Sequence, residues 1–250
     1  MSLGGLVCIR NGFELDYCWR EAVKSLLPIC NEVVICDCDS TDGTKKWIDD
    51  WSMSEPKINP VNYKWTDPRG DTNWYPEWIN YARQHLKTDW FIHLDADEVI
   101  HEDDHHLIEQ AARNQSVHYC KRLNFWRDTS HLVPEGVCLG IKVLRIAGTN
   151  MPIPSDYPYE PAGKTEALAT KSEIRIFHYG FLRHREAFFR KARAVQRIWA
   201  DDFDPRLESA EKGFGNWMEF EGVVPWKDQL TEYKGGHPEI IKPWLRERGF

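Results

Sequence analysis

Apolar residues in the first hundred positions fall into short continuous runs separated by helix-length segments. The runs at 5–9, 32–36 and 89–94 are typical of strands that are buried on both faces. Between them, apolar residues three or four positions apart predict amphipathic helices. These helices cover 14–27, 44–51 and 76–86. Such alternation of strand and helix predicts a parallel sheet covered by helices.

The pattern changes after an acidic segment that begins a further helix at 101–114. Strand-like stretches follow, and a proline-rich loop separates the last two of them. The stretches cover 116–126, 136–146 and 172–179. Residues 184–200 then have the spacing of an amphipathic helix. Because no repeat, low-complexity tract or flexible linker divides the chain, we expect one domain over 1–250.

Charge and composition exclude several classes of partner. Lys and Arg total 32 against 39 Asp and Glu, which gives a net charge of −7 over 250 residues. A net-acidic chain lacks the basic field that attracts nucleic acid or an anionic membrane. No apolar run has the length of a transmembrane helix, and the first residues do not resemble a signal peptide. Seven cysteines without a C-x-x-C pair favour a reduced, cytoplasmic setting.

Carboxylates follow directly on the third predicted strand, in the order Asp95-Ala96-Asp97-Glu98. Ligands of open parallel sheets bind beyond the carboxyl ends of the strands. Residues two apart at an extended strand end point the same way, so we expect Asp95 and Asp97 to converge. Paired carboxylates suit Mg²⁺ or Mn²⁺ that also holds substrate phosphates. The alternative is a solvated acidic turn.

Asp37 ends the strand before, and the segment DSTDGT continues from it. We expect Asp42 to cap the following helix, since its side chain can accept from free backbone amides. Asp37 is placed to accept hydrogen bonds from the base or ribose of a nucleotide. No G-x-G-x-x-G follows the first strand and no phosphate-binding P-loop is present, which disfavours dinucleotide and ATP folds of those kinds.

Four segments occur in a fixed order: CIRNG, VVICDCDSTDGT, NYARQHLKTDWFIHLDADE and FHYGFLR. Together they resemble the family 2 glycosyltransferases of the GT-A fold, in which the second segment reads VVDDGSTDGT. The resemblance covers residues 5–100 well and 173–190 loosely. Cys38 and Asp39 stand where the family usually has Asp and Gly, which puts the ribose contacts of that turn in question.

The resemblance implies an α/β fold of GT-A type, with a mainly parallel central sheet flanked by helices. Residues 1–115 would form the half that binds the nucleotide sugar, and 116–200 a mixed-strand acceptor half. A helical C-terminal extension would cover 201–250. The activity it implies is transfer of a sugar from a nucleoside-diphosphate sugar, with inversion at the anomeric carbon.

The implied metal is Mn²⁺ or Mg²⁺. Asp97 would hold it, with Asp95 nearer the ribose or a metal-bound water, so that the ion neutralises the leaving diphosphate. The resemblance adds His178 as a third ligand, which would favour Mn²⁺. We interpret the acidic stretch at 101–106 as the first turn of a helix, where carboxylates complement the helix dipole, and not as a metal cluster.

Further residues are candidates for contacts with the donor. Arginines near the pocket can clamp diphosphate oxygens, although a solvated arginine is an equal alternative. The full set of nucleotide and donor candidates is Arg10, Asn11, Asp37, Asp39, Arg83, Asp95 and Arg183.

Inversion requires a general base that takes the proton of the acceptor hydroxyl. The proline-rich loop holds three acids, Asp156, Glu160 and Glu166. We favour Glu160, because partial burial by Tyr159 and Pro161 would raise the pKa of its carboxyl, with Asp156 close behind.

The expected donor is a UDP-sugar, and the expected acceptor is a hydroxyl group of a glycan, polysaccharide or lipopolysaccharide precursor. Aromatic residues in the tail leave a homo-oligomer open. A sugar- or nucleotide-binding module without turnover is the main alternative. A nucleotidyltransferase is less favoured, because those enzymes carry a glycine-rich basic loop after the first strand and IRNGFELD has one glycine there.

Overall fold

The computed structural model describes residues 2–66, 74–115, 117–134, 142–150, 169–199, 208, 211 and 229–250. Strands are β1 (Leu3–Ile9), β2 (Glu32–Asp37), β3 (Ile58–Asn62), β4 (Trp90–Asp95), β5 (Glu98–Ile100), β6 (Val117–Asn124), β7 (His131–Leu132), β8 (Lys142–Gly148), β9 (Ala169–His178) and β10 (Thr231–Glu232). Helices are α1 (Trp19–Leu26), α2 (Thr44–Ser54), α3 (Trp74–Arg83), α4 (His105–Arg113), α5 (Arg185–Trp199) and α7 (Lys242–Glu247). Short 3₁₀ turns are η1 (Glu102–Asp104) and η5 (Glu239–Ile241).

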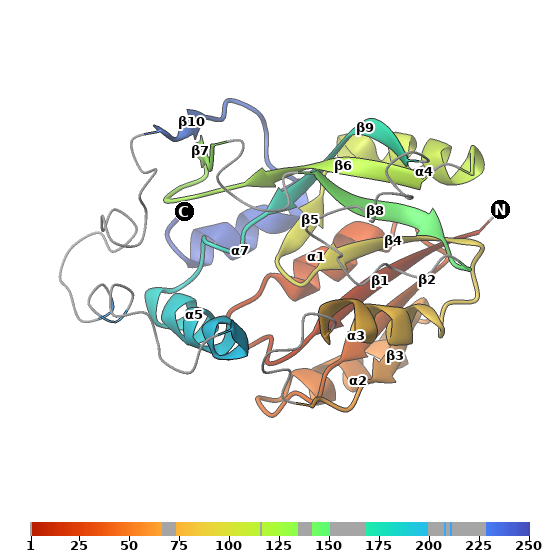
Figure 1. The fold of residues 1–250 in the computed structure, drawn as a ribbon, viewed down its shortest axis with the longest axis horizontal. Coiled ribbons are helices and arrows are strands. Elements are labelled where there is room, and N and C mark those ends of the chain that lie inside the picture. Colours follow the sequence, from red (N-terminus) through yellow and green to blue (C-terminus); the bar gives the residue numbers. More distant parts are fainter. Residues whose placement is uncertain are drawn as a thin grey trace.

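Eight of these strands form a central sheet in the order β3-β2-β1-β4-β8-β6-β9-β5 (Figure 1). The first four are parallel, as the alternation of strands and helices predicts. Beyond β4 the sheet is mixed: β8 is antiparallel to both neighbours, whereas β6 and β9 are parallel. The predicted fold class, a mainly parallel sheet flanked by helices with a mixed-strand second half, is confirmed.

Side chains of β1 alternate between two hydrophobic clusters, one on each face of the sheet. Val7 and Ile9 belong to the cluster that includes Leu26 of α1, whereas Leu6 belongs to the one that includes Ile79 of α3. All of these side chains are essentially buried. Because both faces of β1 are covered, its sequence is a continuous apolar run and not an alternating one.

One expected helix is shorter in the structure, and one strand of the first half is additional. The helix expected over 14–27 begins only at Trp19, because residues 11–16 form a turn in which Asn11 and Asp16 have positive φ angles of 52° and 51°. Asp42 holds this turn by accepting hydrogen bonds from the backbone N–H groups of residues 13 and 14. The sequence analysis predicts no strand over 58–62, where the structure has β3; its Pro60 is tolerated because β3 lies at the sheet edge.

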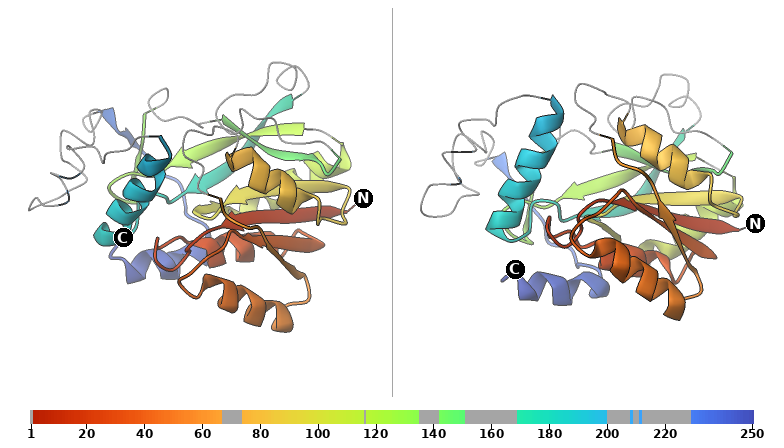
Figure 2. Two further views of the ribbon diagram at one scale, coloured as in Figure 1. Left: turned by 60° about the horizontal axis from the view of Figure 1, so that its bottom comes forward. Right: turned by 90° about the horizontal axis from the view of Figure 1, so that it is seen from below.

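Of the C-terminal extension expected over 201–250, the structure describes residues 208, 211 and 229–250, and its helix α7 packs on the second half of the sheet. Ile241, Trp244 and Leu245 belong to one buried cluster with Val99 of β5 and Phe177 of β9. Figure 2 shows α7 (blue) at the same end of the molecule as α5 (cyan). The tail therefore covers apolar surface of the sheet next to the segments that follow β1 and β9.

Two further observations concern the cysteines and the helices. The six cysteines that the structure describes are buried, and none of them forms a disulfide with another described residue. No helix among the described residues is long and apolar enough to cross a membrane.

A buried ion pair ties the tail to the turn after β1. The Arg248 guanidinium contacts the Asp16 carboxylate, and Asp16 also accepts from the backbone N–H of His184 at 2.9 Å. Burial raises the pKa of the Asp16 carboxyl, but Arg248 and the His184 N–H outweigh it, so the net pKa is lowered. The pair thus stabilises the fold above the pKa of an unfolded aspartate, and this contribution is lost as pH falls through the lower folded pKa.

We expect Arg248→Met to lower the free energy of unfolding by about 3–5 kcal/mol at pH 7, because Asp16 then stays buried without its partner. The difference from wild type should shrink below about pH 4 as Asp16 is protonated. Urea unfolding at pH 7 and pH 3 measures both quantities. Arg246→Met, at an exposed position in the last turn of α7, is the control, and an equal effect of the two substitutions would contradict the assignment.

Candidate functional site

Asp37 and Asp95 lie on the two sides of β1 at the carboxyl end of the parallel strands. Each is the last residue of its strand. In the register of the sheet, Asp37 is paired with Ile9 and Asp95 with Cys8. The structure thus brings the two carboxylates to one edge of the sheet, where α/β folds bind ligands.

Hydrogen bonds join the turns after β1 and β2 around Asp37. Asp37 Oδ2 accepts from the Ser40 N–H at 3.0 Å, and the Ser40 hydroxyl accepts from the Asn11 N–H at 2.8 Å. Arg10 donates to the Cys38 carbonyl at 2.8 Å. The other Asp37 oxygen, Oδ1, is buried and has no hydrogen-bond partner among the described residues. An unused acceptor on a buried carboxylate is suited to an N–H or O–H donor of a ligand.

Arg10 directly follows β1, and Asp39 lies in the turn after β2, at the same edge of the sheet. The Arg10 guanidinium lies 4.6 Å from the centre of the Trp65 ring, a cation–π distance. Asp39 is exposed and has a left-handed backbone with φ 63°. The family that the sequence resembles usually has glycine here, which adopts such a conformation without strain.

Asp97 is buried and is held by side chains from the second half of the chain. Its Oδ2 accepts from Arg183 Nη2 at 2.9 Å and from Lys191 Nζ at 2.7 Å. Its Oδ1 lies 3.5 Å from His178 Nε2. Burial raises the pKa of the Asp97 carboxyl, but the charges of Lys191 and Arg183 and the His178 contact outweigh it and hold the pKa well below its usual range. Asp97 is therefore ionised.

His178 stands in a row of buried polar residues across three strands. In the register of the sheet, it is paired with Glu98 of β5 and with Asn124 of β6. Burial, more than its neighbour Arg122, lowers the pKa of His178 to about 4, so the imidazole is neutral at pH 7. Its Nδ1 is buried without a hydrogen-bond partner in the part of the chain that the structure describes.

Asp95 and Asp97 face different partners, contrary to the expected convergence on one ion. Asp95 Oδ2 is 3.4 Å from Arg122 Nη2, whereas Arg122 Nε is 2.7 Å from the fully buried Glu98. Asp97 instead points to Arg183 and Lys191. The reason is local: the chain turns after Asp95, and β5 begins at residue 98, so the extended geometry that would align the two side chains ends at Asp95.

This arrangement does not match the expected divalent-cation site. Asp97 is already paired with Arg183 and Lys191, and Asp95 lies beside Arg122. Within the described ranges, no group of three or more His, Cys, Asp or Glu residues is placed to hold a metal ion. The role of Mn²⁺ or Mg²⁺ stays a prediction of the sequence.

Arg183 is a buried structural residue and not an exposed clamp for phosphate. Its side chain is 1% exposed. Besides Asp97, it donates to the carbonyl of Gly180 at 2.8 Å and to the carbonyl of Leu15, and it stacks on the Tyr17 ring at 4.7 Å. With these contacts its guanidinium is used within the protein.

Arg83 lies at the opposite end of the sheet from Asp95, so the structure does not bring it to the candidate site. Arg83 donates to the carbonyl of Thr149. Thr149 directly follows Gly148 of β8, which is paired with Trp90 at the start of β4. Trp90 begins β4 and Asp95 ends it, a separation of about 16 Å along the strand. Arg83 instead lines a surface cavity of about 910 Å³.

Sequence reasoning missed Lys191, Glu98 and Arg122. Lys191 lies on the predicted amphipathic helix, where only the apolar spacing carried a signal. Glu98 directly follows the D-x-D motif, but its burial depends on β5, which was not expected. The predicted base residues, Glu160 and Asp156, lie outside the described residues.

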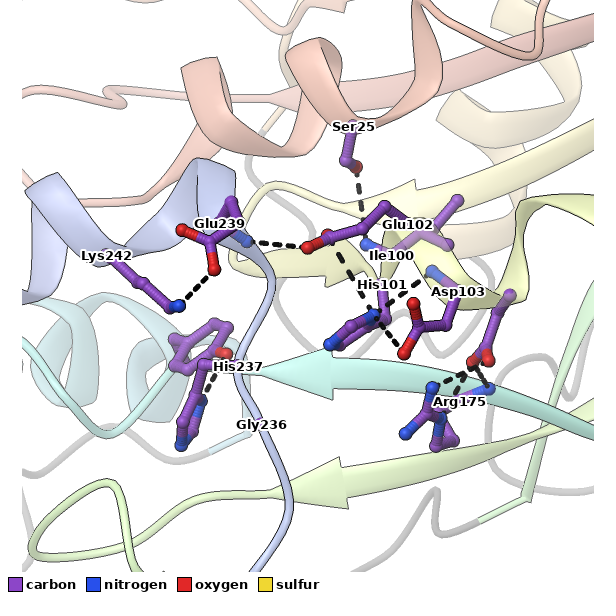
Figure 3. Close-up of polar contacts among 12 residues, drawn as sticks. Ser25, Ile100, His101, Glu102, Asp103, Arg175, Gly236, His237, Glu239 and Lys242 are labelled. Carbon is purple, nitrogen blue, oxygen red and sulfur yellow. Dashed lines mark hydrogen bonds and ion pairs between the residues drawn. The ribbon is translucent and has the colours of Figure 1, made fainter.

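The acidic segment at 101–106 takes part in a junction between the sheet and the C-terminal tail (Figure 3). Asp104 forms a bidentate ion pair with Arg175 of β9. Arg175 Nη2 lies 2.7 Å from Asp104 Oδ1, and Arg175 Nε lies 2.9 Å from Asp104 Oδ2. Glu102 accepts from the backbone N–H of Glu239 at 3.2 Å. Asp104 thus joins this segment to β9 and Glu102 joins it to the tail, while the segment itself forms η1 and the start of α4.

Comparison with known proteins identifies the fold. No family model and no curated protein matches the chain. The structure of S. aureus TarS 1–349 in complex with UDP-GlcNAc has 12% sequence identity and a TM-score of 0.50, and the match covers 99% of this chain and 79% of that chain. The TarS 1–349 complex with UDP has 14% identity and a TM-score of 0.47, over 79% of this chain and 70% of that one.

A longer S. aureus TarS structure has 12% identity and a TM-score of 0.46, over 79% of this chain. The match covers 43% of that longer chain. At such identities the likeness concerns the fold alone. The fold is therefore a GT-A-like α/β fold, similar to that of the TarS 1–349 complex with UDP-GlcNAc.

We expect Gly180→Ala to disrupt the Asp97–His178 contact, because a Cβ there would lie 2.3 Å from His178 Nε2 and 2.7 Å from Asp97 Oδ2. Overpacking of this kind costs about 1–3 kcal/mol, or roughly 2–4 °C in Tm per kcal/mol. Thermal unfolding measures the loss. Gly236→Ala is the matched control, since the nearest atom to its added Cβ lies 3.8 Å away. An unchanged Tm for Gly180→Ala would show that this contact tolerates a side chain.

Proposed function

We propose that this chain is a glycosyltransferase that takes a sugar from a UDP-sugar and transfers it to a hydroxyl acceptor. The observation that carries the proposal is the placement of Asp37 and Asp95 on either side of β1, at the ligand-binding edge of the sheet. The GT-A-like fold supports it, because the S. aureus TarS structure with this fold is a complex with UDP-GlcNAc.

Asp37 is proposed to bind the base or ribose. Its Oδ1 is a buried acceptor without a partner among the described side chains, and a nucleoside offers N–H and O–H donors. Arg10, Asn11 and Asp39 line the turns beside it and would complete the nucleoside pocket. Asp95, one strand further, would face the ribose or the diphosphate.

The proposed reaction is an inverting displacement. The acceptor oxygen forms a bond to the anomeric carbon while the bond from that carbon to the diphosphate oxygen breaks, and its electron pair leaves with the diphosphate. The acceptor's proton passes to a carboxylate, for which Glu160 and then Asp156 are proposed. The acceptor class, a glycan, polysaccharide or lipopolysaccharide precursor, is part of the proposal.

The first test is a thermal-shift panel of UDP, GDP, CMP and dTDP, each with EDTA and with Mn²⁺. We expect UDP to stabilise the protein by about 2.7 kcal/mol at one hundred times its dissociation constant, or roughly 5–10 °C in Tm. Asp37→Asn should weaken UDP binding at least about tenfold, because it removes the buried charge and one acceptor.

The control for that substitution is Asp49→Asn on α2, where the carboxylate pairs with Lys45 on the exposed face of the helix. Its UDP affinity should equal that of wild type. No shift with any nucleotide, in EDTA or in Mn²⁺, would contradict the proposed function. A shift with UDP but no sugar transfer to any acceptor would favour the binding module without turnover.

We expect Glu160→Gln to bind UDP-sugar as wild type does and to transfer the sugar at least about 100-fold more slowly, because the amide cannot take the acceptor's proton. Donor affinity by calorimetry and transfer rate under saturating donor separate the two effects. Glu166→Gln, in the same segment, is the control. If Glu160→Gln retains the wild-type rate, the base is another residue, and Asp156→Asn is the next variant.

A further inference from the structure

Protein cations stand where the sequence predicts a metal ion. Lys191 Nζ and Arg183 Nη2 lie 2.7 Å and 2.9 Å from the same oxygen of Asp97. A divalent cation on that oxygen would be close to both positive groups and would be repelled by them. The described carboxylate is therefore arranged to hold ammonium and guanidinium groups.

These two cations differ in what they can reach. Arg183 is 1% exposed and donates to Asp97 and to the backbone carbonyls of Gly180 and Leu15. The Lys191 side chain is 24% exposed, and an ammonium has three donors, of which the Asp97 contact uses one. Lys191 is thus the cation of the pair that is able to contact a ligand while Asp97 still holds it.

The surroundings of Lys191 orient it and favour an anion. The Tyr17 ring, from the turn after β1, lies 5.2 Å from Lys191 Nζ, so the ammonium is next to the edge of the sheet where β1 ends. The helix that carries Lys191, α5, has five Lys or Arg residues and one Glu, in a chain whose net charge is −7. Arg193 of this helix is paired with Glu211, but the helix sequence is basic on balance, which favours an anionic ligand over a cation.

We propose that Lys191, positioned by Asp97, contacts the diphosphate of the nucleotide sugar and supplies the positive charge that the sequence motif assigns to a metal. This inference rests on the proposed function. As the bond between the anomeric carbon and the diphosphate oxygen breaks, the electron pair stays on the diphosphate, and the Lys191 ammonium neutralises the developing charge. The acceptor oxygen takes the place of the leaving group on that carbon, and its proton goes to the base carboxylate. Asp97 is a positioning residue in this scheme.

The test compares UDP with uridine, which lacks phosphates, by calorimetry on the whole chain in EDTA. We expect wild type to bind UDP in EDTA with an affinity within about threefold of that in Mn²⁺. Lys191→Ala should weaken UDP binding at least about tenfold and leave uridine binding unchanged, because a charge-assisted hydrogen bond to phosphate is lost. Lys191→Arg should restore part of the UDP affinity.

Lys242→Ala is the matched control, since Lys242 also pairs with a carboxylate on a helix but belongs to the C-terminal tail. It should bind both ligands as wild type does. Equal UDP affinity of Lys191→Ala and wild type, or UDP binding by wild type only with Mn²⁺, would overturn the inference and leave the proposed function standing. A parallel loss of uridine binding in Lys191→Ala would make Lys191 structural and overturn it too. Failure of wild type to bind any nucleotide, with or without Mn²⁺, would overturn the proposed function as well.

Discussion

The buried charge of Asp97 is the constraint on which the rest of the site depends. An ionised carboxylate inside a protein is stable only when opposite charges and hydrogen bonds replace the water that it has lost. Arg183 and Lys191 supply those charges from segments about ninety residues away in sequence, in the loop after β9 and on α5. Arg183 also reaches the carbonyl of Leu15 in the turn after β1. One carboxylate thus fixes three segments of the chain around the edge of the sheet.

The same interaction changes the meaning of the D-x-D motif. Two acids after a buried strand suggest a negative surface that attracts a divalent ion. In the folded chain, Arg122 lies beside Asp95, and Lys191 with Arg183 lies on Asp97, so positive charge from the second half of the chain meets the motif. The local balance of charge, on which phosphate recognition depends, is set by these long-range contacts.

The parts of the site that could be predicted are those fixed by strand ends. Asp37 and Asp95 each end an apolar run, and parallel strands bring their carboxyl ends to one edge, so their placement follows from local pattern and sheet geometry. The contacts of Arg83 and Arg183 could not be predicted in this way. A long side chain can extend in several directions, and its destination depends on carbonyl groups and carboxylates of distant segments, such as Thr149 for Arg83.

The sequence by itself determined the α/β class, the parallel first half and the position of the acids at strand ends. Those features depend on hydrophobic periodicity and on short turns, which are local properties of the chain. Only the tertiary structure decided which charges meet: that Asp97 is paired with Lys191, that Asp16 is paired with Arg248, and that Glu98 is buried in a strand of three residues. The physical reason is that burial and ion pairing are properties of surfaces brought together by the fold, and no local pattern encodes them.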